Sequence, residues 1–211
     1  MKTYIIHLIR HGTTEGNKNG QYIGVTDIPI STNGIKELEQ LREAGVYPEV
    51  DVCYASPLLR CRQSLEVIYP GVNPILVEDL RECDFGIFEG RSAQELAGNA
   101  DYKAWTAGKI DAPPGGESTA AFTQRVCAGF GQMVRHMMEN GITQAAAVVH
   151  GGVIMSILST CALPQLPFFQ WMSGNGRGYS VRVTPSVYLR SGVVEVSDQI
   201  PPADWEGPRE G

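Results

Sequence analysis

Tyr4-Ile5-Ile6-His7-Leu8-Ile9-Arg10-His11-Gly12 is the stretch of sequence that decides the fold. Its first six residues are nearly all apolar, which is typical of a strand buried on both faces of a parallel sheet. The residues from Gly12 to Asn17 predict the turn that follows this strand. Ligands of open α/β sheets bind just outside the carboxyl ends of the strands. Arg10 and His11 therefore stand where a binding site is expected.

A second strand of the same kind lies far along the chain. Residues 145–149 form another small apolar run, which leads directly into His150, Gly151 and Gly152. The glycines and the apolar residues after them predict a helix whose free amide groups face the same region as His150. Two strands that each end in a histidine suggest one shared site.

The rest of the chain alternates strands and helices. Further strands are predicted over residues 50–54, 75–77, 179–183 and 193–196. Helices are predicted over 32–44 and 118–138 from the spacing of their apolar residues. Another helix is predicted from Ser56-Pro57 onward, because serine caps a helix and proline suits its first turn. This alternation predicts an α/β fold, a three-layer α/β/α sandwich with a mostly parallel central sheet.

Length and composition predict one domain. The chain of 211 residues, of which 43% are hydrophobic, is long enough to bury a core. Because its sequence shows no linker, repeat or low-complexity tract, we predict a single domain over residues 1–211. Residues 97–114, with aromatic side chains and several glycines, are predicted to form a lid. Residues 200–211 are predicted to be an irregular tail.

Charge and cysteine content argue against several classes of function. A net charge of −6 argues against nucleic-acid binding, and it means that a local cluster of cations must attract any anionic substrate. The five cysteines are widely spaced, which favours reduced thiols over disulfides or zinc. The first apolar run is short and ends in charge. We therefore expect neither a signal peptide nor a membrane span, and a cytoplasmic protein.

The residues at the strand ends supply chemistry that a phosphate ester needs. Arg10, Arg60 and His150 are candidates to bind phosphate, because a guanidinium group matches two phosphate oxygens and stays charged. His11 is the candidate nucleophile, because a neutral imidazole has a ring nitrogen free to attack phosphorus. Its other ring nitrogen is expected to donate to a backbone carbonyl, and the nearby arginines are expected to favour its neutral form.

A leaving alkoxide also needs a proton. We predict that Glu82 donates it, because apolar neighbours would raise the pKa of its carboxyl group. Glu82 lies in the segment Leu80-Arg81-Glu82-Cys83-Asp84-Phe85-Gly86-Ile87-Phe88-Glu89-Gly90. Asp84 and Glu89 are the competing acids, and each serves equally well as a loop or capping carboxylate.

A metal site is the weaker interpretation of the same residues. His11, His150 and Glu82 are ligand types that zinc accepts. Arg10 and Arg60 beside them would repel a cation, so we predict neither a metal nor a cofactor.

Five segments of the chain together resemble the histidine phosphatase superfamily, also called the phosphoglycerate mutase-like family. Besides residues 80–90, they are LIRHGTTEGN at 8–17, YASPLLRCRQS at 54–64, PGGES at 114–118 and VHGG at 149–152. One such segment is weak evidence, but five in order over nearly the whole chain are specific. The resemblance implies a phosphoglycerate mutase-like fold and a metal-independent reaction through a phosphohistidine.

The resemblance also implies the roles of individual residues. His11 would carry the phosphoryl group and Glu82 would donate the proton. Phosphate would be bound by Arg10, Arg60 and His150. The residues predicted to contact substrate are Asn17, Tyr22, Thr26 and Gly151.

Within this family the chain is more similar to the phosphatases than to the mutases. Mutases must hold a second phosphate or a carboxylate, and their acid segment typically reads Glu-Arg-His-Tyr-Gly. Residues 82–86 here read Glu-Cys-Asp-Phe-Gly, so a cation is lost and an anion is gained. Val25 stands where mutases usually have tryptophan. The run Phe85-Gly86-x-Phe88-Glu89-Gly90 is similar to α-ribazole phosphatases and to broad-specificity phosphatases.

The predicted function is hydrolysis of a small phosphorylated metabolite, with α-ribazole 5'-phosphate as one candidate. The alternatives are a phosphoglycerate mutase and a non-catalytic module that binds a phosphorylated ligand. We predict a monomer or homodimer that binds neither nucleic acid nor membrane. Arg62, Arg81 and Arg177 could reach either substrate or solvent.

Overall fold

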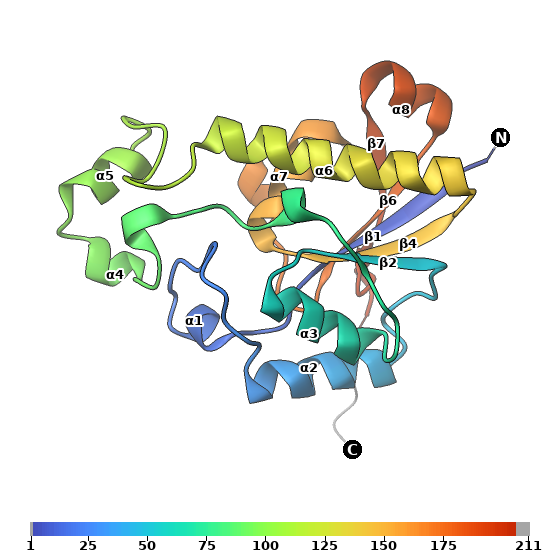
Figure 1. The fold of residues 1–211 in the computed structure, drawn as a ribbon, viewed down its shortest axis with the longest axis horizontal. Helices are drawn as coiled ribbons and strands as arrows, with labels where there is room; N and C mark the ends of the chain where they lie inside the picture. Colours follow the sequence, from blue (N-terminus) through green and yellow to red (C-terminus); the bar gives the residue numbers. More distant parts are fainter. Residues whose placement is uncertain (1, 206–211) are drawn as a thin grey trace.

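A single β-sheet forms the centre of the computed structural model, which describes residues 2–205 (Figure 1). Within these residues the sheet has seven strands in the order β3-β2-β4-β1-β6-β7-β5. The strands are β1 (Tyr4–Arg10), β2 (Val52–Ala55), β3 (Ile75–Leu76), β4 (Gln144–Val149), β5 (Ala162–Leu163), β6 (Gly178–Val183) and β7 (Val194–Ile200).

Most neighbouring strands run parallel, as predicted. β1 pairs with β4, β4 with β2, β2 with β3 and β7 with β5 in parallel. β6 runs antiparallel to both β1 and β7. In the central pair Arg10 lies opposite Val149. β1 and β4 therefore end at the same level, and the chain delivers His11 and His150 to the same edge of the sheet.

Helices cover both faces of the sheet (Figure 1). α6 (Thr119–Asn140) and α7 (Gly151–Cys161) contribute to one hydrophobic core. α2 (Thr32–Glu43) and α3 (Leu59–Ile68) contribute to a second core on the opposite face. This arrangement confirms the three-layer α/β/α sandwich.

The alanine run of β4 explains how one strand serves both cores. Ala145 and Ala147 belong to the core beside α6 and α7, whereas Ala146 belongs to the core beside α2 and α3. All three side chains are fully buried. Successive side chains of a strand point to opposite faces, so a run without polar residues suits a strand that is covered on both sides.

The remaining elements are short. The α-helices are α1 (Glu15–Lys18), α4 (Ala93–Leu96), α5 (Ala100–Thr106) and α8 (Pro185–Ser191). Single turns of 3₁₀ helix are η1 (Glu78–Leu80), η2 (Gly86–Phe88) and η3 (Phe168–Trp171). α4 and α5 lie beyond the end of α6, away from the sheet (Figure 1).

The helix after β2 begins later than the sequence predicted. Ser56 was expected to cap it, but α3 starts at Leu59 and its capping position is Leu58. The Ser56 hydroxyl lies instead 2.8 Å from Nε2 of His150. The Leu59 amide donates to the carboxylate of Asp27, which comes from another loop, at 2.6 Å. A residue distant in sequence therefore caps the helix, and local patterns do not reveal it.

Other details of the elements also differ from the prediction. Residues 12–17, expected to form a turn, include the first residues of α1, which Thr14 caps. β5, of two residues, was not predicted. β7 extends through Ile200, so the irregular segment begins at residue 201. Residues 206–211 of the predicted tail lie outside the described residues.

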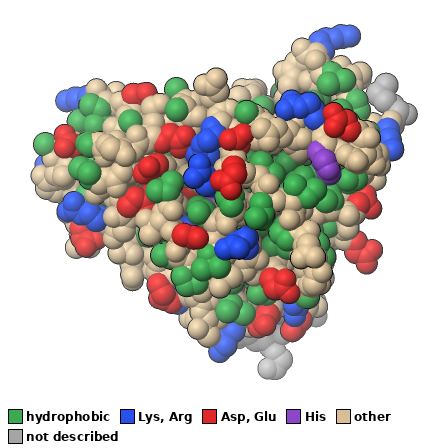
Figure 2. Space-filling view, viewed as in Figure 1, with side chains coloured by type: hydrophobic (Ala, Val, Ile, Leu, Met, Phe, Trp, Pro, Cys, Tyr) green, Lys and Arg blue, Asp and Glu red, His purple; other side chains and the backbone are tan. Residues whose placement is uncertain are grey.

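Charged side chains of both signs lie side by side on the face shown in Figure 2. A substrate anion approaching this face therefore meets mixed charge rather than a broad cationic surface. Separately, none of the helices between residues 2 and 205 has the length and apolar character that a bilayer crossing requires.

We expect replacement of Phe130 by alanine to destabilise the fold strongly. Phe130 lies on α6 and is fully buried in the core, and Phe→Ala changes in cores cost about 3–5 kcal/mol. Urea denaturation of the variant measures this loss in the free energy of unfolding. Glu139→Ala, at an exposed position of the same helix, is the control and should change it by less than about 0.5 kcal/mol. A loss below about 1 kcal/mol for Phe130→Ala would contradict this packing.

Candidate active site

His11 follows directly on β1 and is almost completely buried, with 4% of its surface exposed. Its Nδ1 lies 2.8 Å from the carbonyl oxygen of Gly12. Because a carbonyl oxygen only accepts hydrogen bonds, Nδ1 carries the hydrogen and Nε2 keeps its lone pair. The Gly12 amide donates to Ser64 on α3 at 2.8 Å and so fixes the turn. The expected hydrogen bond from the ring to a backbone carbonyl is therefore present.

The surroundings of His11 favour its neutral form. Burial, followed by the positive charge of Arg60, lowers the pKa of His11 to about 3. Arg10 acts in the same direction, while the hydrogen bond to Gly12 opposes it. The imidazole is therefore neutral at physiological pH, as a nitrogen nucleophile requires.

Arg10, the last residue of β1, has a donor without a partner. Its Nη1 donates to the carbonyl of Ser173 at 2.7 Å. Its Nε is buried and has no hydrogen-bond partner among the described residues. A Cβ at Gly151 would lie 3.3 Å from this Nε, so the glycine leaves room beside it. An unpaired buried donor is costly, and an anion that accepts from it would remove this cost.

Arg60 and His150 contact each other. Nε of Arg60 donates to Nδ1 of His150 at 3.2 Å. Nε2 of His150 must then carry the ring hydrogen, which points to the Ser56 hydroxyl. The remaining nitrogens of Arg60 donate to the carbonyls of Thr26, at 2.9 Å, and Gly24, at 2.6 Å. Direct phosphate binding by Arg60 and His150 stays a prediction, because their polar atoms have protein partners in this structure.

The ring of His150 also lies against that of His11. Their centroids are 5.3 Å apart in an edge-to-face arrangement. Burial, and then the charge of Arg60, lowers the pKa of His150 well below its ordinary value. Two neutral rings thus occupy the edge where β1 and β4 end.

Glu82 is buried at the amino end of α7. One carboxylate oxygen accepts from the Cys83 amide and the other from the Gly152 amide, each at 3.0 Å. A Cβ at Gly152 would lie 2.3 Å from the carboxylate, so glycine is needed for this approach. Burial raises the pKa of Glu82, against the opposing influence of the two amides and of the Arg10 and Arg60 charges. A raised pKa suits a general acid.

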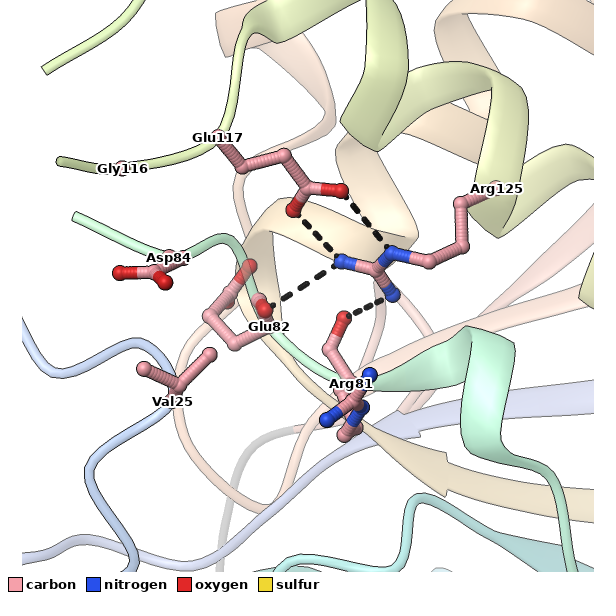
Figure 3. Close-up of a pocket in the computed structure, with 7 residues that line it drawn as sticks. All are labelled: Val25, Arg81, Glu82, Asp84, Gly116, Glu117 and Arg125. Carbon is pink, nitrogen blue, oxygen red and sulfur yellow. Dashed lines mark hydrogen bonds and ion pairs between the residues drawn. The ribbon is translucent and has the colours of Figure 1, made fainter. Parts of the chain in front are cut away.

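A cavity of about 290 Å³ opens beside Glu82 (Figure 3). Its remaining lining residues come from the loop after α1, the acid segment, the residues just before α6 and α6 itself; they are Val25, Arg81, Asp84, Gly116, Glu117 and Arg125. The cavity is therefore mostly polar, with charges of both signs around its rim.

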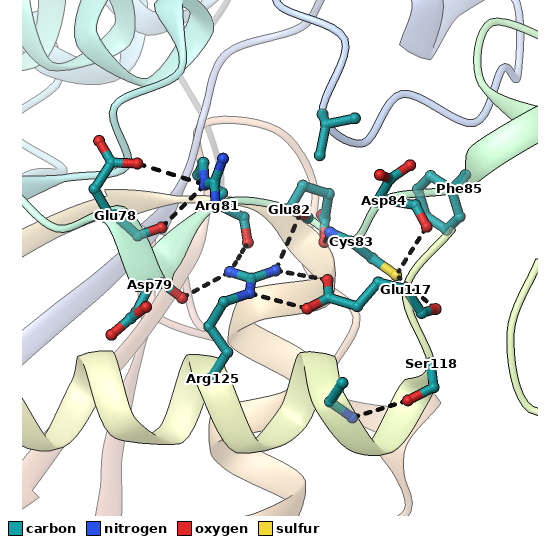
Figure 4. Close-up of polar contacts among 12 residues, drawn as sticks. Glu78, Asp79, Arg81, Glu82, Cys83, Asp84, Phe85, Glu117, Ser118 and Arg125 are labelled. Carbon is teal, nitrogen blue, oxygen red and sulfur yellow. Dashed lines mark hydrogen bonds and ion pairs between the residues drawn. The ribbon is translucent and has the colours of Figure 1, made fainter. Parts of the chain in front are cut away.

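Arg125, on α6, binds the segment that carries Glu82 (Figure 4). Its guanidinium group pairs with both carboxylate oxygens of Glu117, at 3.0 and 2.7 Å. It also donates to the carbonyls of Asp79 and Arg81, at 2.9 and 3.0 Å, and of Glu82, at 3.5 Å. Arg125 is not among the site residues predicted from the sequence. Glu117 was the signal that could have pointed to Arg125. It is an acid in the recognised segment PGGES, and a partly buried carboxylate needs a cationic partner.

Glu89, one of the competing acids, holds a loop. Its carboxylate accepts from the amides of Gly24, Val25 and Thr26, and from the Phe85 amide at 3.0 Å. These bonds tie the loop at residues 24–26 to the acid segment. Glu89 therefore acts as a loop carboxylate, which was one of its two predicted roles.

The four residues predicted to contact substrate lie around the site. Asn17 accepts through Oδ1 from the amides of Thr14 and Asn175, at 3.1 and 3.2 Å, which leaves its Nδ2 group to donate. Thr26 lies in the loop bound by Glu89, and Gly151 lies beside Arg10. Tyr22 is half-buried. Their contact with substrate stays a prediction.

Tyr22 belongs to an aromatic cluster that holds α5 against the acid segment. Its hydroxyl lies 2.9 Å from that of Tyr102, and its ring centroid lies 5.7 Å from Trp105. Phe85 and Phe88, from the acid segment, contact the same rings. The cluster places residues of the predicted lid, 97–114, next to this segment. Whether they act as a lid stays a prediction.

The three arginines of open assignment are all exposed. Arg177 lies over the ring of Trp205, 5.6 Å from its centroid. Arg81 lines the cavity, and its Nε lies 3.5 Å from the carboxylate of Glu78. Of the three, the structure places Arg81 at the cavity.

Comparison with known proteins identifies relatives along most of the chain. The family model described as "Histidine phosphatase superfamily (branch 1)" matches residues 6–186. A 2,3-bisphosphoglycerate-dependent phosphoglycerate mutase of Rhizobium etli is 30% identical over 169 residues, covering 74% of this chain and 78% of the relative. An adenosylcobalamin/alpha-ribazole phosphatase of Salmonella typhimurium is 32% identical over 124 residues, covering 56% of this chain and 61% of the relative.

A solved structure shows the same fold. The alpha-ribazole phosphatase of Shigella flexneri superposes with a TM-score of 0.73 over 91% of this chain and 94% of its own, at 23% identity. This likeness supports the fold, and the sequence relatives include both phosphatases and mutases.

We expect the buried neutral His11 to make the fold sensitive to acid. Its pKa is about 3 in the folded state and about 6.5 in an unfolded chain. As the pH falls below 6.5, the unfolded chain takes up a proton that the folded protein does not, so stability decreases. His11→Gln removes this contribution and should lose about 2 kcal/mol less stability than wild type between pH 7 and pH 5. Urea denaturation at the two pH values measures it, and equal losses would contradict the burial of a neutral ring.

Proposed function

The chain belongs to the histidine phosphatase superfamily, and we propose that it is a metal-independent phosphomonoesterase acting on a small phosphorylated metabolite. The observation that carries this proposal is the state of His11. Its Nδ1 is fixed by the Gly12 carbonyl, its Nε2 is free, and its pKa is lowered to about 3. Such a ring can form a covalent bond to phosphorus at neutral pH.

The first step transfers the phosphoryl group to His11. Nε2 attacks phosphorus and forms a P–N bond, while the bond between phosphorus and the ester oxygen breaks. The leaving oxygen takes a proton from Glu82, a role that the raised pKa of this carboxyl group favours. The products of this step are the free alcohol, phosphorylated His11 and an ionised Glu82.

The second step returns the enzyme to its starting state. A water molecule attacks phosphorus as Glu82 takes a proton from it, and the P–N bond breaks. Inorganic phosphate leaves, His11 recovers its lone pair and Glu82 is again protonated. One ester and one water thus give one alcohol and one phosphate, with no net change in the enzyme.

Fixed positive charge supports both displacements. We propose that the unpaired Nε of Arg10 donates to a phosphate oxygen, and that the amides at the start of α7 lie near the same oxygens. Preorganised donors of this kind often make the largest contribution to catalysis. The two guanidinium groups near His11 and Glu82 also disfavour a bound metal ion, which supports a metal-independent reaction.

The cavity beside Glu82 favours a phosphatase over a mutase. Arg125 is paired with Glu117, so it is not available to hold a second phosphate or a carboxylate. Among esters without such a group, α-ribazole 5'-phosphate is the candidate to test first, because the Salmonella typhimurium relative is named for it. Phosphoglycerate mutation remains the alternative, since the Rhizobium etli relative is a mutase.

The proposed activity is tested with p-nitrophenyl phosphate and α-ribazole 5'-phosphate in the presence of EDTA. We expect phosphate release from both, and an acid-labile phosphoryl adduct in quenched, radiolabelled protein that His11→Gln lacks. Complete dependence on a divalent ion, or wild-type turnover by His11→Gln, would contradict the proposal. Isomer formed from phosphoglycerate faster than free phosphate would favour the mutase, and binding without product release would favour a non-catalytic module.

We expect Glu82→Gln to affect poor leaving groups far more than good ones. p-Nitrophenol leaves readily as an anion, whereas an alkyl alcohol needs the proton of Glu82. kcat/KM should therefore fall about 10²- to 10⁴-fold for glycerol 3-phosphate and much less for p-nitrophenyl phosphate. The ratio of the two kcat/KM values measures the effect. Equal losses for both esters would show that Glu82 is not the general acid.

A further inference from the structure

We propose that the cavity beside Glu82 selects esters whose alcohol half carries no anionic group, and that Asp84 is the residue that determines this specificity. This inference rests on the proposed phosphatase function and adds a substrate class to it. It follows from where the alcohol must lie and from which charges around it remain unpaired.

The position of Glu82 fixes where the alcohol half binds. A general acid must reach the ester oxygen that it protonates, and the attacking and leaving groups stand roughly in line at phosphorus. The alcohol therefore lies on the Glu82 side of the phosphoryl group, away from His11. The cavity in Figure 3 opens beside Glu82 and is the space available to it.

Both cations at this cavity lie beside a carboxylate, but only Arg125 forms a partly buried ion pair. The guanidinium group of Arg125 makes a two-point contact with Glu117 and three more hydrogen bonds to backbone carbonyls. Both side chains of this ion pair are only 19% exposed. Arg81 lies beside Glu78, and 44% of its side chain is exposed to solvent. Arg125 is therefore not free to bind a substrate carboxylate, and the charge of the exposed Arg81 is partly offset by Glu78.

The carboxyl groups at the cavity are not all neutralised in the same way. Glu117 is neutralised by Arg125, and the proposed reaction uses Glu82 in its protonated form, which its raised pKa favours. Asp84 is the remaining carboxylate at the cavity, and the salt bridges among the described residues do not include it. Figure 3 shows its carboxyl group at the rim of the cavity, across from Arg125.

Asp84 is also held in place. One carboxyl oxygen accepts from the Gly86 amide at 2.8 Å, and its backbone carbonyl accepts from the Glu117 amide at 2.9 Å. A Cβ at Gly116 would lie 2.5 Å from that carbonyl, so the two segments touch closely. The charge therefore cannot withdraw far when a second anion approaches. Neutral or cationic alcohols meet no such repulsion.

Two esters of nearly equal size test the proposal. Glycerol 3-phosphate carries a hydroxymethyl group where 3-phosphoglycerate carries a carboxylate. We expect wild type to hydrolyse glycerol 3-phosphate with a kcat/KM at least about tenfold higher, as repulsion between close like charges predicts. Asp84→Asn keeps the oxygen that accepts from Gly86 and removes the charge. This substitution should lower the ratio of the two kcat/KM values by about tenfold at low ionic strength.

A matched control separates local from overall charge. Asp198, exposed on β7, also accepts from a neighbouring amide, so Asp198→Asn makes the same change in charge away from the cavity. Asp198→Asn should keep the wild-type preference. Added salt should lower the ratio of the two kcat/KM values for wild type but not for Asp84→Asn. Salt screens charge repulsion and does not change the shape of the cavity.

The outcomes distinguish this inference from the proposed function. An unchanged preference in Asp84→Asn, or a wild type that favours 3-phosphoglycerate, overturns the inference even if p-nitrophenyl phosphate is hydrolysed. Absence of p-nitrophenyl phosphate hydrolysis overturns the proposed function. In that case the affinities of glycerol 3-phosphate and 3-phosphoglycerate for wild type, Asp84→Asn and Asp198→Asn are measured by calorimetry. The ratio of the two affinities then replaces the ratio of kcat/KM values, and the same changes in it support or overturn the inference.

Discussion

The parallel pairing of β1 with β4 is the constraint on which the rest of the site depends. The register places Arg10 opposite Val149, so the two strands end together and His11 meets His150 edge to face. A shift of one residue would turn every side chain of β1 to the opposite face. The alanines of β4 are buried on both sides, and their small side chains suit a strand with a helical layer on each face.

Burial then determines the chemistry of the groups gathered there. The same loss of water lowers the pKa of His11 and raises that of Glu82. Burial thus favours the neutral form of each group, which is a ring with a lone pair at His11 and a protonated carboxyl group at Glu82. In water both would carry charge over part of the acidic range, and neither would be ready to act. The pair of roles arises from one environment.

Local patterns in the sequence were sufficient for most of the strands, for the layers and for the place of the two histidines at strand ends, because a buried strand and its end depend on neighbouring residues. They were insufficient where a residue of one segment makes a hydrogen bond that another, distant segment needs. Asp27 caps α3 from a separate loop, Ser56 faces a ring 94 residues away instead of capping its own helix, and Arg125 supports an acid segment more than 40 residues earlier. Such contacts depend on the tertiary fold and leave little trace in any one stretch.

The loop at residues 24–26 is bound from two sides, its amides to Glu89 and two of its carbonyls to Arg60. A phosphate that takes the guanidinium group of Arg60 must displace those carbonyls. The affinity for phosphate is then the difference between the hydrogen bonds that Arg60 makes to phosphate and those that it loses to the loop. In such an exchange, a loop bound this firmly lowers the affinity for phosphate, so the contacts that hold the loop also favour the release of product phosphate.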